Sequence, residues 1–200
     1  MDEFYDIVPT PDDRDNHKPL LAQWLDTLLK IQITSVALSV LALIPWVNEV
    51  ARWIPPLLSA GVVLVLFRLA PASGRYRKAA LFRCITLAGT VLALFDISAL
   101  SLVTSVCSII ASYQEYNAHS EVTHAAPVLS GKWHSLFYWQ LVAGILSGFG
   151  AVAGTVIAVL VGVGTTAIAS GVVVVITAVS IVLQIVYVIY LKKTLELFRY

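Results

Sequence analysis

The longest uncharged stretch of this 200-residue chain runs from Ser135 to Leu191, 57 residues without aspartate, glutamate, lysine or arginine. A transmembrane helix needs about 20 mostly apolar residues, so this stretch alone is long enough for two crossings. A segment in lipid must satisfy its own backbone hydrogen bonds, so the crossings are expected to be helices. The stretch therefore predicts an all-α, multi-pass integral membrane protein.

The composition agrees with this class and excludes others. Hydrophobic residues make up 58% of the chain and charged residues 12%, whereas roughly a quarter of an ordinary soluble domain is charged. A net charge of +1 creates no positive field that would attract nucleic acid, so no nucleic-acid partner is expected. The sequence lacks the zinc-protease, nucleophile-elbow and phosphate-loop motifs, so we expect neither an enzyme nor a cofactor.

The first thirty residues divide into two parts. Residues 1–17 combine clustered aspartates with two prolines and are expected to form a disordered acidic tail. Residues 18–30 place their apolar side chains on one helical face and predict an amphipathic helix at the membrane interface. The alternative is that this apolar face packs on the helical bundle.

Residues 18–200 are expected to form a single transmembrane domain, a bundle of about five helices that follows the interfacial helix. The predicted spans are 31–47, 54–70, 79–111, 135–161 and 167–191. The first two have the minimum length for a crossing, and the third is long enough to extend beyond the hydrocarbon. Glycine and threonine at 162–166 favour a tight reversal between the last two.

Basic residues suggest an orientation for the bundle. Those that follow the second span predict a cytoplasmic loop and hence a cytoplasmic N-terminus: Arg68, Arg75, Arg77, Lys78 and Arg83. Five crossings leave Lys192, Lys193 and Arg199 on the opposite side, against the positive-inside rule, whereas four or six would not. Five is the prediction because 57 uncharged residues suit two helices, and the sequence leaves open which membrane is occupied.

Asp96 is the candidate ion or proton site. It is the only charged residue between Arg83 and Glu115 and lies in the middle of the third predicted span. An ionisable group at that depth must face water, a cavity or a polar partner such as Gln184, or else be protonated. The alternative is a hydrogen-bonded acid that only locks two helices together.

Two faces of small or hydroxyl side chains accompany this candidate. On the third span, Ser98, Ser101 and Ser105 follow helical spacing and either line a pore or allow close helix approach. The fourth span carries a helix-packing face of small residues, formed by Gly144, Gly148, Gly150, Ala151, Gly154 and Ala158. Such a face brings backbones together, either within one chain or between two copies.

Residues 112–134, between the third and fourth spans, are expected to form a solvated loop. His119 and His124 in this segment are weak candidates for metal binding or pH sensing. They are five residues apart, whereas a helical zinc motif places two histidines four residues apart, so no metal is predicted.

Two functions are compatible with these patterns. The first is a non-enzymatic accessory, regulatory or scaffold subunit that acts through helix–helix assembly in the lipid bilayer, with a second copy or another membrane subunit as its partner. The alternative is a small ion channel or proton-coupled transporter that uses Asp96, with Ser98, Ser101, Ser105 and Gln184 along its path. Five helices are few for a path within one chain, so the alternative implies a homo-oligomer.

Overall fold

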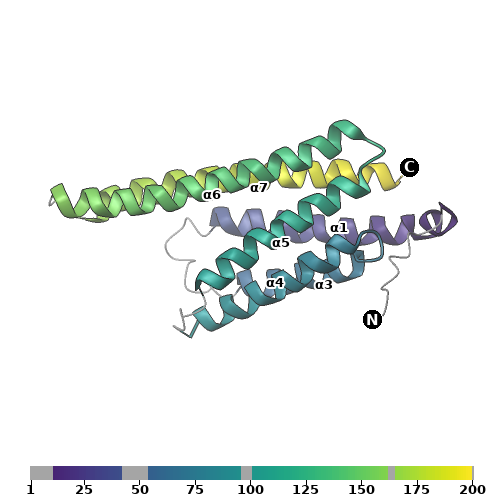
Figure 1. Cartoon of the computed structure of the whole chain (residues 1–200), viewed down its shortest axis with the longest axis horizontal. Coiled ribbons are helices and arrows are strands. Elements are labelled where there is room, and N and C mark those ends of the chain that lie inside the picture. Colours follow the sequence, from purple (N-terminus) through teal and green to yellow (C-terminus); the bar gives the residue numbers. More distant parts are fainter. Residues whose placement is uncertain (1–10, 42–53, 96–100, 162–164, 200) are drawn as a thin grey trace, which may run out of the picture.

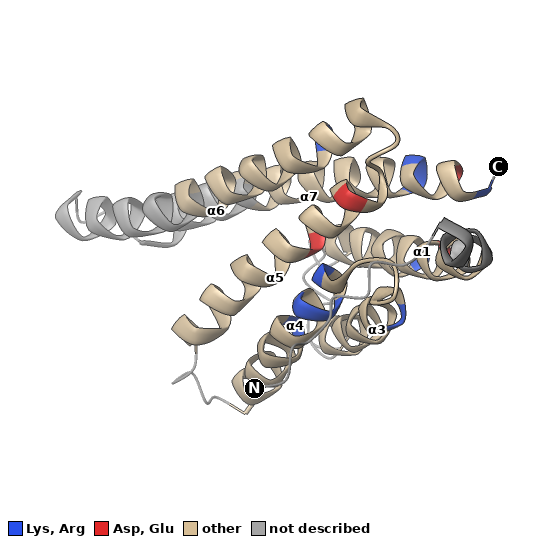
Figure 2. Cartoon of the chain, turned by 45° about the vertical axis from the view of Figure 1, so that its right-hand side comes forward, with Lys and Arg blue, Asp and Glu red and all other residues tan. Residues whose placement is uncertain are grey.

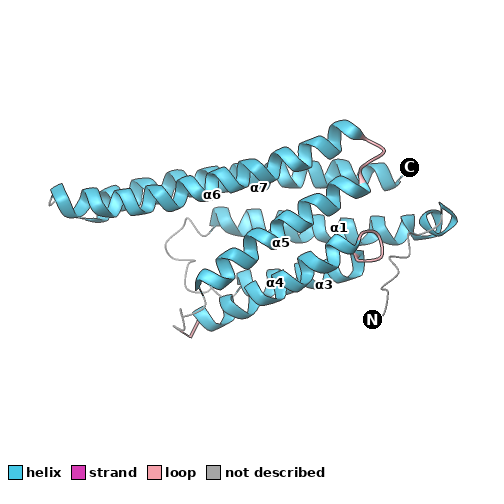
Figure 3. Cartoon of the chain, viewed as in Figure 1, coloured by secondary structure: helices cyan, strands magenta, loops and turns pink. Residues whose placement is uncertain are grey.

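The computed structural model of the chain describes residues 11–41, 54–95, 101–161 and 165–199, with side chains at 19–41, 54–95, 101–146, 175 and 177–199. Regular secondary structure in this part of the chain is entirely helical (Figure 3), which confirms the all-α prediction for it. The helices are α1 (Pro11–Leu41), α3 (Ile54–Leu69), α4 (Gly74–Ala93), α5 (Ser101–Val122), α6 (Pro127–Val161) and α7 (Thr165–Arg199).

The six helices of the described residues alternate in direction and form a closed ring (Figure 1). Each helix packs against the next one along the chain, and α7 returns to pack against α1. Short turns at 70–73 and 123–126 join α3 to α4 and α5 to α6. Both turns lie at the end of the bundle where α1 begins and α7 ends.

Charged side chains gather at this same end, which we call the charged end (Figure 2). The described helical stretches that lead from it to the opposite, uncharged end contain no Asp, Glu, Lys or Arg. These stretches are 31–41, 54–67, 84–95, 101–114, 133–146 and 177–191. The ring is therefore polar at one end and apolar along the remainder of its described length.

The hydrophobic core lies at the charged end. Leu25 and Leu28 of α1 are fully buried there against Leu66 of α3 and Leu191 of α7. The structure corrects the prediction of a separate interfacial helix at 18–30. These residues are part of the longer helix α1, and their apolar face packs on the bundle, as the alternative proposed. Residues 11–17 belong to α1 as well, so the predicted tail is helical from Pro11 onward, and residues 1–10 lie outside the described part.

The predicted third span, 79–111, is not one helix. α4 ends at Ala93, α5 begins at Ser101, and the two pack side by side in opposite directions. Gly89 makes this possible because its missing side chain lets α5 approach: a Cβ atom there would overlap Thr104. The intervening sequence carries Asp96 and Ser98, residue types that favour turns and caps over helix interiors.

The predicted loop at 112–134 is also wrong. α5 continues to Val122, and only a short turn separates it from α6, which begins at Pro127. Proline is favoured in the first turn of a helix because it has no amide hydrogen to satisfy. Several polar residues of this segment, which suggested a loop, are instead buried in the bundle: Glu115, Asn117, His119, Ser120 and Thr123.

Two segments of the described residues, Pro19–Leu41 and Thr177–Arg199, are long and apolar enough to cross a membrane. Only 17% and 22% of their most apolar windows are buried inside the ring. α3 (Ile54–Leu69) is apolar but shorter, and it covers nearly the same residues as the second predicted span.

The contact between Gly89 and Thr104 gives a first test of the fold. Gly89→Ala should destabilise the protein by about 1–3 kcal/mol, because the new methyl group overpacks the α4–α5 contact. Adding Thr104→Ser, which removes the overlapping Cγ2 methyl, should recover part of the loss. Thermal unfolding of the purified variants measures both effects.

Gly131→Ala is the matched control, since a Cβ atom there meets nothing within 4 Å. It should leave the midpoint unchanged or raise it, because alanine restricts the unfolded chain by about 0.4–1 kcal/mol relative to glycine. Equal midpoints for Gly89→Ala and Gly131→Ala would contradict the α4–α5 packing.

Candidate functional site

A buried ion pair joins α4 to α5 near the charged end. The Glu115 side chain is only 1% exposed, and its Oε2 accepts a hydrogen bond of 3.0 Å from Arg83 Nη2. The same nitrogen lies 3.4 Å from Ser112 Oγ. A buried carboxylate costs several kcal/mol unless it is paired, so Arg83 is what allows Glu115 to be charged inside the bundle.

Glu115 is one member of a chain of hydrogen bonds that crosses the ring from α4 to α7. Tyr187 of α7 donates to its Oε1 at 2.6 Å. The Tyr187 oxygen lies 3.2 Å from His119 Nε2, and His119 Nδ1 lies 2.8 Å from the Tyr76 hydroxyl. The order along the chain is therefore Tyr76, His119, Tyr187, Glu115 and Arg83.

With a neutral imidazole, only one assignment of donors and acceptors satisfies every hydrogen bond in this network. Tyr187 donates its hydroxyl proton to Glu115, so the Tyr187 oxygen must accept a hydrogen bond from His119 Nε2. His119 Nδ1 is then free to accept the Tyr76 proton. This arrangement assigns the hydrogen of the neutral ring to Nε2.

Aromatic side chains close the histidine off from water. Trp133 of α6 stacks on the His119 ring with centroids 4.4 Å apart, and its indole nitrogen donates to Thr194 Oγ1 at 3.1 Å. Tyr76, His119 and Trp133 are all fully buried. At the charged end, the interior of the ring is thus filled by this hydrogen-bond network and by the aromatic side chains that surround it.

Burial and the ion pair set the protonation of the two titratable groups on α5. Burial lowers the pKa of His119 from 6.5 to about 4, against the opposing effect of Glu115. Burial by itself would raise the pKa of Glu115, but the Arg83 charge and the hydrogen bond from Tyr187 bring it below its ordinary value. At neutral pH the site therefore holds a neutral histidine beside a charged Arg83–Glu115 pair.

A cavity of about 410 Å³ opens on the uncharged side of this pair. All six described helices line it, so it lies at the centre of the ring. Arg83, Glu115 and Tyr187 form part of its wall. The other polar groups around it are amides and hydroxyls: Gln32, Ser35, Ser39, Ser59, Ser112, Gln140 and Gln184.

Arg83 is not fully satisfied by its protein partners. Its Nε is buried without a hydrogen-bond partner, and 29% of its side chain is exposed. Both oxygens of Glu115, in contrast, already accept hydrogen bonds. The charged part of the cavity wall therefore offers donors more than acceptors.

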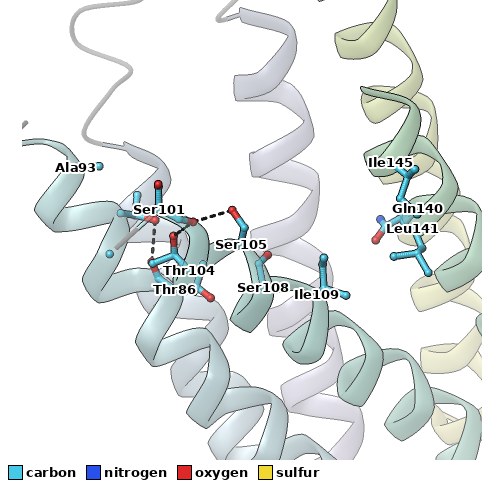
Figure 4. Close-up of a pocket in the computed structure, with 13 residues that line it drawn as sticks. Thr86, Ala93, Ser101, Thr104, Ser105, Ser108, Ile109, Gln140, Leu141 and Ile145 are labelled. Carbon is cyan, nitrogen blue, oxygen red and sulfur yellow. Dashed lines mark hydrogen bonds between the residues drawn. The ribbon is translucent and has the colours of Figure 1, made fainter. Parts of the chain in front are cut away.

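A second hollow, a groove of about 630 Å³, lies between α5 and α6 where these helices diverge toward the uncharged end. Figure 4 shows Ser105, Ser108 and Ile109 of α5 facing Gln140 and Leu141 of α6 across the gap. α4 contributes Thr86, Gly89, Thr90 and Ala93. Gln140 borders both the groove and the central cavity.

The structure separates the predicted ion-site residues. Gln184 lines the central cavity, where its Oε1 lies 3.5 Å from Ser39 Oγ, whereas Ser101 and Ser105 line the groove. Asp96 and Ser98 lie outside the described residues. The premise of an unbroken helix through Asp96 is wrong, since α4 ends three residues before it.

The small-residue face of α6 is described only at its start. Gly144 is exposed at the groove, and a Cβ atom there would meet nothing within 4 Å. Among the described residues, no helix therefore packs closely on that position. The side chains at Gly148, Gly150, Ala151, Gly154 and Ala158 lie outside the described part of α6.

The two histidines considered for metal binding are placed differently. His119 is buried between two tyrosines, whereas His124 is exposed in the turn after α5. Among the described residues, no three His, Cys, Asp or Glu side chains form a group that could hold a metal ion.

Sequence reasoning missed the ion pair because it assigned Arg83 to a cytoplasmic cluster and Glu115 to a loop. The available indication was their separation. They are 32 residues apart, and Asp96 is the only charged residue between them. A hairpin centred near Asp96 would have aligned the two charges. Tyr76 and Tyr187 gave no separate indication, since isolated tyrosines are common in membrane helices.

Two exposed ion-pair clusters flank the buried one at the charged end. Arg75 of α4 pairs with Glu121 of α5, which also accepts from Ser73 Oγ at 2.7 Å. Asp26 of α1 pairs with Lys30 and with Arg199 of α7, each at 2.8 Å. The Arg75–Glu121 pair joins the same two helices as Arg83–Glu115 but lies at the surface, so it is a natural control for it.

Comparison with protein-family models, curated proteins and solved structures finds no match to this chain. Its function therefore has to be inferred from its own residues.

His119 predicts a pH-dependent stability. Its folded-state pKa of about 4 lies below the unfolded value of about 6.5, so the unfolded chain binds the extra proton first and stability falls as pH falls between these values. The loss between pH 7 and pH 5 should be about 2 kcal/mol. Thermal unfolding at the two pH values measures it.

His119→Gln is the variant that isolates the effect, because glutamine offers one donor and one acceptor but does not titrate. Its midpoint should fall clearly less than that of the wild type between pH 7 and pH 5. Equal falls in both proteins would assign the pH dependence to other groups.

Proposed function

We propose that the chain is an integral membrane protein with six crossings whose central cavity binds a small polar solute and passes it across the membrane. It acts as a binding or transport protein and not as an enzyme. The observation that carries this proposal is the polar cavity lined by all six helices of a ring whose outward faces are apolar.

The outward faces favour a lipid environment. Leu64 of α3 and Leu102 of α5 are 67% and 76% exposed, and many other large apolar side chains of the uncharged stretches are exposed as well. A soluble monomer rarely exposes a contiguous apolar patch of more than a few hundred Å². A lipid environment is also supported by the two segments whose length and composition suit a membrane crossing.

The distribution of basic residues supports six crossings with the charged end in the cytoplasm. Of the 13 lysines and arginines in the sequence, only Arg52 falls outside the helices and turns of the charged end. An even number of helices returns Lys192, Lys193 and Arg199 to that end, which removes the conflict that five crossings created with the positive-inside rule.

Aromatic residues suggest where the cytoplasmic boundary of the hydrocarbon lies. Tyr113 of α5 and Tyr138 and Trp139 of α6 are exposed where the uncharged stretches approach the first charges. Exposed Tyr and Trp are typical of the membrane–water interface. This boundary keeps Glu115 and His119 at or beyond the edge of the hydrocarbon, with the central cavity extending from there into the bilayer.

The cavity itself argues for a polar solute. Its volume of about 410 Å³ falls within the roughly 300–1,000 Å³ of ordinary small-molecule sites. Burying amides, hydroxyls and an ion pair is costly unless water or a ligand completes their hydrogen bonds. A ring of six helices also encloses the site within one chain, so a homo-oligomer is not needed to form it.

A second candidate function is assembly with another copy or another membrane subunit. Gly144 favours it, because this glycine begins the small-residue face of α6, and a Cβ atom there would meet no other helix of the described residues. α6 and α7, each 35 residues long, also extend beyond the shorter α4 and α5 at the uncharged end (Figure 1). Such a protruding hairpin offers an apolar surface to a partner.

Cysteine labelling tests the main proposal, in a background with Cys84→Ser and Cys107→Ser. Ser39→Cys in the cavity should react with a water-soluble thiosulfonate added from outside the cell. Leu64→Cys on the outer face of α3 should not, because a thiolate does not form in lipid. Ala72→Cys and Ala125→Cys, in the two turns of the charged end, should react only after the membrane is opened.

Each outcome of the labelling has a distinct meaning. Opposite sides for positions 72 and 125 would restore the five-crossing topology. Rapid labelling of Leu64→Cys in intact membranes would place the outer face in water and contradict the membrane proposal. An unreactive Ser39→Cys would contradict a solute path from the outside.

Gly144→Leu tests the second candidate. If α6 packs on a partner at this position, leucine should dissociate the complex and reduce its mass in detergent to that of one chain. Gly131→Leu on the same helix, at the charged end, is the control and should leave the mass unchanged. A wild-type protein that is already monomeric would exclude self-association as its function.

A further inference from the structure

Among the described residues, the charged wall of the central cavity holds one carboxylate, Glu115, and one guanidinium, Arg83. Arg83 Nη2 bonds Glu115 and Ser112, whereas its Nε has no partner. A guanidinium carries five N–H groups in a fixed fork that matches carboxylate oxygens. Because 29% of the Arg83 side chain is exposed and Arg83 lines the cavity, the guanidinium can bind a second carboxylate there while its Nη2 keeps the bond to Glu115.

We propose that the cavity binds a short hydroxylated monocarboxylate at Arg83 and that Glu115 takes up one proton when this anion binds. The inference rests on the solute cavity of the proposed function and names its ligand class and its coupling. A hydronium ion or a buffer acid in the aqueous phase gives up the proton: its bond to that proton breaks, and an O–H bond forms at Glu115 Oε2, the oxygen that faces Arg83. No bond of the ligand forms or breaks.

Charge balance is the reason for the coupling. Without a ligand, Arg83 and Glu115 neutralise each other in the cavity wall. A bound monoanion adds a second negative charge beside Glu115. Keeping both carboxylates ionised in one buried site costs free energy, because like charges repel each other strongly where the dielectric is low. Protonation of Glu115 restores neutrality and leaves Arg83 paired with the ligand.

Among the described groups around Glu115, the other base is the neutral His119, and both of its ring nitrogens already take part in hydrogen bonds with tyrosines. Arg83 and Tyr76 approach from α4, Tyr116 and His119 from α5, and Tyr187 from α7. Tyr187 donates its proton to Oε1, and His119 is held between two tyrosine hydroxyls. The groups that α1, α3 and α6 bring to the cavity wall are amides, hydroxyls and apolar side chains. Among the described groups, Glu115 is thus the acceptor.

The remaining lining fits the rest of the ligand. Gln32, Gln140 and Gln184 each offer a donor and an acceptor, and four serines add hydroxyl groups. These groups can form hydrogen bonds with hydroxyl substituents next to a carboxylate. An acid with a purely apolar chain would form none with them. The cavity volume of about 410 Å³ limits the ligand to a small organic acid.

Calorimetry on the full chain in lipid nanodiscs tests the proposal, with lactate and glycerate as probes and lactamide as the uncharged analogue. Wild-type protein should bind the two acids but not lactamide. Titration in buffers of different ionisation enthalpy should show uptake of about one proton per lactate. The affinity should therefore rise up to about tenfold for each unit of decreasing pH.

Three variants assign the effect to the buried pair. Glu115→Gln should bind lactate without proton uptake and with an affinity independent of pH. Arg83→Gln combined with Glu115→Gln leaves no unpaired charge and should abolish binding, with thermal unfolding as the check that it folds. Arg75→Gln combined with Glu121→Gln removes the exposed pair between the same helices and should bind as the wild type does.

The outcomes separate this inference from the proposed function. Binding of lactamide as tight as that of lactate, or binding without proton uptake, overturns the inference but leaves a polar-solute cavity. Unchanged binding in the Arg83–Glu115 double variant also overturns it. Absence of binding by either acid overturns the ligand class, while labelling of Ser39→Cys decides separately whether the cavity is reached from outside.

Discussion

The pairing of Arg83 with Glu115 determines how the helices around it are aligned. Glu115 is buried and charged, and removing the partner of such a group costs about 3–5 kcal/mol, so α4 and α5 are held in the register that brings the two together. Tyr187 then fixes the position of α7 through its bond to the other carboxylate oxygen. His119 and Tyr76 continue the same network back to α4, which ties three helices of the ring to one buried charge.

The ring also explains why the polar residues are distributed unevenly. In a ring of helices that alternate in direction, the turns at 70–73 and 123–126, the start of α1 and the end of α7 all lie on one side, which brings the charged ends together. The aromatic and hydrogen-bonded network seals that side, with Trp133 stacked on His119. Polar groups beyond the seal line either the central cavity or the groove between α5 and α6, while large apolar side chains cover much of the outer surface.

Helix content and the bounds of α3, close to those of the second predicted span, followed from hydrophobic length, because that property is local. The errors came from polar residues whose meaning depends on tertiary contacts. Asp96 looked like a buried charge only because 79–111 was taken as one helix, whereas the uncharged run around it contains the reversal between α4 and α5. Glu115 and His119 looked solvated because their neighbours in sequence are polar, yet α7 and α6 bury them. No periodicity within one helix reports a partner that lies 72 residues away, as Tyr187 does from Glu115.

One consequence of this arrangement links stability to function. The groups that stabilise the charged end are the same groups that form the wall of the cavity, since Arg83, Glu115 and Tyr187 belong to both. A ligand bound at Arg83 therefore changes the charge balance of the same ion pair that joins α4 to α5. On another side of the ring, α5 and α6 diverge toward the uncharged end, and the groove lies between them. Gln140, which borders both hollows, lies where a shift of α6 would join them.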